Sequence, residues 1–147
     1  MKYLKLYENF NNDVDTKKLL SEIIEIAYVI EDHGIILHYC VAQRYDDDMD
    51  GRINFYEIGD SNNIQEEIED LQKYDDFPEK IWRYEIRFRT NNVKLVDEYL
   101  AKLEIHLENY PVEVKKCEFS SDEYGIKVIY KRHMNDLDKS GNILPNH

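Results

Sequence analysis

The chain has 147 residues, of which 42% are hydrophobic, so it is long and apolar enough to form one domain with a buried core. This composition excludes wholesale disorder, and charged residues and histidines interrupt the apolar runs, which excludes a membrane-spanning helix. The formal net charge is −12, and residues 1–75 hold 18 acidic side chains against 7 basic ones. The negative electrostatic potential of these side chains disfavours nucleic acid as a partner and favours basic protein surfaces or divalent cations.

The spacing of apolar residues in the first half of the sequence predicts a helix, a β-hairpin and a second helix. Apolar residues recur at helical spacing from Leu19 to Ile30, and the pattern stops at Gly34. Residues 35–45 alternate and are rich in β-branched and aromatic side chains, and residues 52–58 repeat this pattern, which together predict a hairpin. Residues 63–73 predict a short, very acidic helix.

After a predicted linker around Pro78, the second half again predicts a helix followed by a β-hairpin, here preceded by a strand. Residues 82–89 alternate between apolar and charged side chains, which is the clearest strand pattern in the chain. Asn91 or Asn92 can cap a helix whose apolar stripe runs on toward Leu107 and which ends before Pro111. Residues 112–119 and 125–133 predict a second hairpin.

These elements predict an α+β fold in which one antiparallel sheet carries two main helices packed on one face. We expect a single domain, 1–147, with possible halves 1–75 and 79–134 and a mobile tail, 135–147. Because each half contains a helix followed by a hairpin, a duplicated βαββ unit is consistent with the pattern.

The segment 46–57 resembles an EF-hand calcium loop. Oxygen ligands fall at loop positions one, three, five and nine, with Gly51 at position six and a carboxylate at position twelve. The alternative is an acidic hairpin turn, because the flanking segments predict strands and Asp50-Gly51 is a strong turn pair. The calcium hypothesis names as ligands Asp46, Asp48, Asp50, the carbonyl of Arg52, Asn54 and Glu57.

A second candidate site is an arginine stripe on the strand of residues 82–89. Arg83, Arg87 and Arg89 lie at alternate positions, where their forked guanidinium groups could bind an anion or a protein partner. Cross-strand pairing with acidic residues is the alternative. Nucleic acid is not favoured, because the sequence has no glycine-rich phosphate loop.

No catalytic constellation emerges from the sequence. The histidines have no metal-ligand spacing, and the two cysteines, Cys40 and Cys117, lie in predicted strands as expected for reduced thiols. His38 and Cys40 would be neighbours on one strand face, an arrangement that is mostly structural. We therefore expect a non-enzyme with no cofactor apart from possible calcium, and keep a small enzyme of unknown class as an alternative.

The first ten residues resemble the leader peptides of proteins packaged into the heads of large T-even-type tailed phages. Such leaders begin with methionine and lysine and end near a Leu/Ile-x-Glu cleavage site, which Leu6-Tyr7-Glu8 matches here. The alternative is an edge strand or a docking segment in which Tyr3, Leu4, Leu6 and Tyr7 are partly buried. The resemblance implies a phage accessory protein, located in the virion or in the host cytoplasm. With the acidic composition and the missing catalytic motifs, we expect it to be non-catalytic and to bind a protein partner through its acidic N-terminal half.

Overall fold

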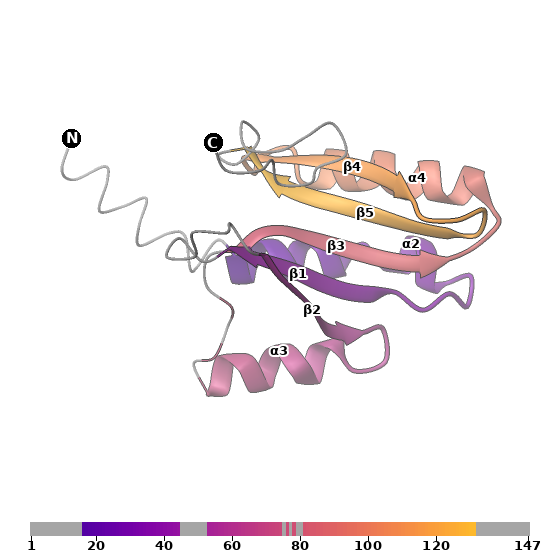
Figure 1. Ribbon diagram of the computed structural model, residues 1–147. Coiled ribbons are helices and arrows are strands. Elements are labelled where there is room, and N and C mark those ends of the chain that lie inside the picture. The colour runs from indigo at the N-terminus through magenta and orange to yellow at the C-terminus, as the bar shows by residue number, and fades with distance from the viewer. Residues whose placement is uncertain (1–15, 45–52, 75, 77, 79–80, 132–147) are drawn as a thin grey trace.

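The computed structural model describes residues 16–44, 53–74, 76, 78 and 81–131 (Figure 1). Five strands form one antiparallel sheet in the order β2-β1-β3-β5-β4. The strands are β1 (His38–Arg44), β2 (Ile53–Asp60), β3 (Ile81–Arg89), β4 (Val112–Glu118) and β5 (Glu123–Tyr130). The α+β prediction is confirmed, and none of the helices in the described ranges is long and apolar enough to span a membrane.

The helices are α2 (Tyr28–Glu31), α3 (Ile64–Lys73) and α4 (Val93–His106), and residues 16–25 are also helical; we refer to these as helix 16–25. Helix 16–25, α2 and α4 lie behind the sheet in the view of Figure 1. Their apolar stripes are buried, as the helical spacing predicts: Leu19, Leu20 and Ile23 on helix 16–25, and Val96, Tyr99 and Leu103 on α4.

Local sequence signals explain where these helices begin and end. The side-chain oxygen of Asn92 accepts a hydrogen bond from the backbone N–H of Leu95 at 3.2 Å, so Asn92 is the residue that caps α4. Gly34 has a φ of 76°, a left-handed conformation that glycine adopts readily, and it separates α2 from β1.

The central strand β3 divides its side chains between the two faces of the sheet. Tyr84, Ile86 and Phe88 join the hydrophobic core on the helix side. The alternating residues Glu85 and Arg87 lie on the other face, because successive strand side chains point in opposite directions. Helix 16–25, α2 and α4 cover the face that carries Tyr84, Ile86 and Phe88. We refer to the opposite face, which carries Glu85 and Arg87, as the helix-free face.

Strand order distinguishes the two halves of the chain. In the first half β1, the first strand of its hairpin, pairs with β3, whereas in the second half β5, the second strand of its hairpin, does so. Both hairpins therefore join one sheet through β3, but they are attached to it in different ways.

Helix α3 packs beside the edge strand β2, and Figure 1 shows it below the sheet. Ile64 and Ile68 are buried with Ile58 of β2, while the remaining surface of α3 is acidic and exposed. The predicted short acidic helix is thus present, attached by one apolar stripe.

Candidate functional site

A hollow of about 650 Å³ lies on the helix-free face, across β2, β1 and β3. Its lining combines apolar groups, such as Ile36 and Phe55, with the charged side chains of Glu57, Arg87 and Arg89. Ile36 and Phe55 are exposed although they are large and hydrophobic. An exposed apolar surface rimmed by charges is typical of binding sites.

Arg87 is the centre of this surface. Its guanidinium carbon lies 4.9 Å from the ring centroid of Phe55 on one strand and 4.4 Å from that of Phe119 in the β4–β5 turn. Both distances are within the range of cation–π attraction, which contributes about 0.5–1 kcal/mol at exposed sites. Because the two rings come from opposite sides of β3 in the sheet, they hold the guanidinium in a defined orientation.

The buried carboxylate of Glu85, on the same strand, also holds Arg87 in place. Glu85 is 1% exposed, and its Oε2 lies 3.0 Å from Nε and 3.0 Å from a terminal nitrogen of Arg87. The hydrogen bond from Nε and the ion pair with the terminal nitrogen compensate the buried charge of Glu85, which would otherwise be strongly unfavourable in the protein interior. The sheet therefore presents Arg87 as a pre-positioned group rather than as a mobile side chain.

A glycine allows Phe119 to reach this position. Gly125 on β5 lies next to Arg87 in the sheet register, and a Cβ at Gly125 would approach the Phe119 ring to 2.7 Å. Since that distance is too short for a real contact, a side chain at residue 125 would displace the ring. Because Gly125 has no side chain, the Phe119 ring can lie across β5 and contact Arg87.

The remaining rim of the hollow consists of paired charges. His38 Nδ1 lies 2.5 Å from Glu57 Oε1, and both side chains are half-exposed. Arg89 lies 2.9 Å from Glu123 and 3.9 Å from Asp122. Each charged side chain of this rim therefore has a nearby partner.

The predicted arginine stripe is only partly a surface. Arg83 is buried, Arg87 is held between two rings, and Arg89 is largely exposed. Arg89 pairs with Glu123 of β5, as the cross-strand alternative expects, whereas Arg87 pairs with Glu85 of its own strand. Anion binding by these arginines stays a prediction.

Both cysteines flank Glu85. Cys117 Sγ lies 3.8 Å from Glu85 Oε1, and Cys40 is the register partner of Glu85 on β1. Burial raises the pKa of Cys40 to about 11 and raises that of Cys117 as well. Both are free thiols, and at neutral pH they are protonated, which makes them poor nucleophiles.

The structure describes only the last residues of the proposed calcium loop. Residues 46–52, with Asp46, Asp48, Asp50 and Arg52, lie outside the described residues. Glu57 lies in β2 and contacts His38, while Asn54 is three residues away on the same strand and points to the opposite face. This position in a strand favours the hairpin alternative, and the calcium site stays a prediction.

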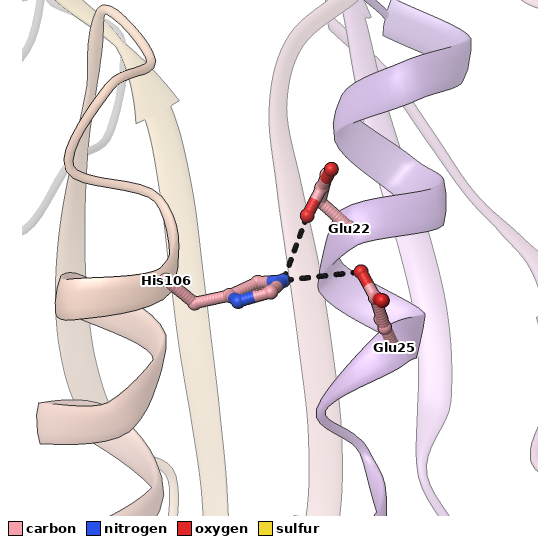
Figure 2. A group of neighbouring side chains, drawn as sticks. All are labelled: Glu22, Glu25 and His106. Atoms are coloured by element: carbon pink, nitrogen blue, oxygen red, sulfur yellow. Dashed lines mark ion pairs between the residues drawn. The ribbon is translucent and has the colours of Figure 1, made fainter.

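A second group of chemically active side chains escaped the sequence analysis. Glu22 and Glu25 on helix 16–25 converge on His106 at the end of α4 (Figure 2). The spacing of the two glutamates was a signal for one shared helix face, but nothing in the sequence relates them to His106. The cleavage-site prediction at Leu6, Tyr7 and Glu8 falls outside the described residues.

Comparisons of this chain with protein-family models, with curated proteins and with solved structures found no match.

Proposed function

We propose that this protein is a non-catalytic accessory protein that binds a protein partner through the hollow around Arg87. The observation that carries the proposal is the clamped guanidinium of Arg87 between the exposed rings of Phe55 and Phe119. Arginine and aromatic side chains are enriched at the centres of protein–protein interfaces, where rigid groups lose little entropy on binding.

The lining suggests the chemistry of the partner. A segment with an aliphatic or aromatic anchor side chain would cover Ile36 and Phe55 in the hollow and Phe119, which contacts Arg87; all three are exposed in the free protein. Basic residues next to that anchor would meet the acidic surface of the chain, whose net charge is −12. The resemblance of the N-terminal peptide to phage leaders supports a role as a phage accessory protein, either in the virion or against a host factor.

Two features argue against a catalytic role for the same surface. The cysteine thiols are protonated at neutral pH, and the arginines at the hollow are paired with carboxylates.

Affinity capture with matched variants tests the proposal. The tagged wild-type chain, a Phe55→Ala/Phe119→Ala variant and an Ile105→Ala control are exposed to the same cell extract, and bound proteins are quantified by mass spectrometry. Ile105 is also an exposed hydrophobic residue, but it lies on α4, behind the sheet. A partner should bind the wild type and the control equally.

The double variant should bind this partner at least 30-fold more weakly, which corresponds to about 2 kcal/mol for truncated hot-spot aromatics. Circular dichroism and melting curves establish that the variants are folded. A partner that binds all three chains with one affinity, or the lack of any specific partner, would refute the proposed surface.

A further inference from the structure

Two helices bring three metal-binding side chains together on the side of the molecule away from the hollow. Glu22 and Glu25 project from helix 16–25, and His106 projects from the last turn of α4 toward both of them (Figure 2). His106 Nε2 lies 2.8 Å from Glu22 Oε2 and 3.4 Å from Glu25 Oε2. The i, i+3 spacing places the two carboxylates on one helix face, directly opposite the imidazole.

The geometry of this cluster differs from that of a hydrogen-bonded ion pair. Nε2 of His106 is buried, yet no described group meets it with the alignment of a hydrogen bond, even though two carboxylate oxygens are near. The oxygens thus lie beside the axis along which Nε2 would donate a proton. A ligand centred between the three atoms accounts for this arrangement better than a proton on the ring.

A metal ion is such a ligand. With metal–ligand bonds of about 2.1 Å, the two measured separations correspond to N–metal–O angles of roughly 84° and 108°. These angles span the octahedral and tetrahedral values. They also place each oxygen about 35–50° off the nitrogen–metal axis, which is where an aligned N–H···O bond cannot form.

Charge favours a cation at the same point. Two carboxylate side chains converge on this point, and the neighbouring cation on α4, Lys102, pairs with Glu98 of its own helix at 3.2 Å. A divalent ion would neutralise the two glutamates without drawing on that pair.

We infer that Glu22, Glu25 and His106 form a binding site for a divalent transition-metal ion, with Zn²⁺ as its best ligand. One imidazole nitrogen and two carboxylate oxygens, without sulfur, suit Zn²⁺ and related ions, whereas Ca²⁺ and Mg²⁺ require sites made of oxygen. The ion joins helix 16–25 to α4, and water completes its coordination. The site is separate from the hollow, so either proposal can fail alone.

Zinc titration of the full-length chain tests this site. Isothermal titration calorimetry after removal of metals with EDTA compares the wild type with Glu22→Gln and His106→Gln. Glu69→Gln on α3 and His33→Gln after α2 serve as controls, because both are exposed residues of the same types outside the cluster. The control variants should bind Zn²⁺ like the wild type, and the two cluster variants at least tenfold more weakly.

Thermal unfolding gives a second readout. Zn²⁺ at a hundredfold excess over its dissociation constant should raise the melting temperature of the wild type by roughly 5–11 °C. The rise should be absent in His106→Gln, and Ca²⁺ and Mg²⁺ should produce none at the same concentration. If His106→Gln does not fold, Glu25→Gln replaces it, since the Glu25 side chain is largely exposed and its amide keeps the same size.

X-ray absorption at the zinc edge identifies the ligands independently of stability. One imidazole and otherwise oxygen neighbours support the site. Equal zinc affinity in wild type and His106→Gln, or sulfur in the zinc shell, would overturn it. The proposal is also overturned if the cluster variants are less stable than the wild type without metal while zinc does not change the stability of the wild type. The cluster would then be an ion pair only.

Discussion

The buried carboxylate of Glu85 should stabilise the fold chiefly through Arg87, and Glu85→Gln tests this. Glutamine keeps the volume of the side chain but loses the charge, and its amide nitrogen cannot accept a hydrogen bond from the guanidinium. In the wild type, Oε2 of Glu85 accepts a charge-assisted hydrogen bond of 3.0 Å from Nε of Arg87 and forms an ion pair with a terminal nitrogen of Arg87 at 3.0 Å. A hydrogen bond to a charged group contributes about 1.5–3 kcal/mol.

Partial rehydration of Arg87 reduces the expected loss. The Arg87 side chain is 36% exposed, so water can solvate it once Glu85 is gone. We therefore expect Glu85→Gln to lower the free energy of unfolding by about 2–3 kcal/mol, less than the 3–5 kcal/mol typical of a fully buried pair. For a chain of this length the melting temperature should fall by roughly 4–12 °C.

A double-mutant cycle measures the interaction itself. Urea unfolding followed by the fluorescence of Trp82 gives the stability of Glu85→Gln, Arg87→Gln and the double variant, and the coupling energy should be roughly 1.5–3 kcal/mol. Glu123→Gln is the matched control, since its pair with Arg89 has the same chemistry but lies near the surface. This control should lose less than about 1 kcal/mol.

The result that would refute this reasoning is a coupling energy below about 0.5 kcal/mol, or a loss in Glu123→Gln as large as that in Glu85→Gln. Either outcome would mean that burial does not strengthen the Glu85–Arg87 pair.

Four further predictions concern the helices and a thiol. Asn92→Ala should lower the free energy of unfolding by about 1 kcal/mol by removing the α4 cap, whereas Asn91→Ala should change it by less than about 0.5 kcal/mol in urea denaturation. Leu103→Ala, at a fully buried site, should lower the free energy of unfolding by about 3–5 kcal/mol. Ile105→Ala, on the exposed side of the same helix, should lower it by less than about 0.5 kcal/mol. Similar losses in the two variants would mean that the wrong face of α4 has been placed against the sheet. Burial raises the pKa of Cys40 to about 11, so at pH 8 only about one Cys40 thiol in a thousand is ionised and iodoacetamide should label it far more slowly than a peptide thiol. Because this folded-state pKa lies above the unfolded value of 9.0, the folded chain holds the proton more tightly, and this contribution to stability should be lost as pH rises from about 9 to 11; urea midpoints at pH 8 and 10.5 check the sign.

Periodicity predicted most of the elements, and its errors occurred at their ends. The helix expected to continue to Ile30 is interrupted at residues 26–27, so that α2 is a separate short helix. The strand expected from Ile35 begins at His38, because Leu37 instead bonds through its backbone N–H to the Ser61 hydroxyl at 2.7 Å. Such bonds between distant residues leave no trace in a local pattern.

The candidate sites were less predictable than the fold. Alternation along residues 82–89 identified Arg83, Arg87 and Arg89 as one face, and register confirms that Arg83 and Arg87 share it with Glu85. The same alternation could not tell that Arg83 is buried, or that Phe55 and Phe119 would reach Arg87 from two other parts of the chain.

The sequence by itself determined the α+β class, the two hairpins, the apolar stripes of the main helices and the acidic character of α3, because each follows from the spacing of side chains within one segment. Only the tertiary structure decided which residues from separate segments meet. It placed β3 between the two hairpins, Arg87 between two phenylalanines, and His106 against Glu22 and Glu25. Local periodicity determines which way a side chain points, whereas strand order and helix packing determine what it meets.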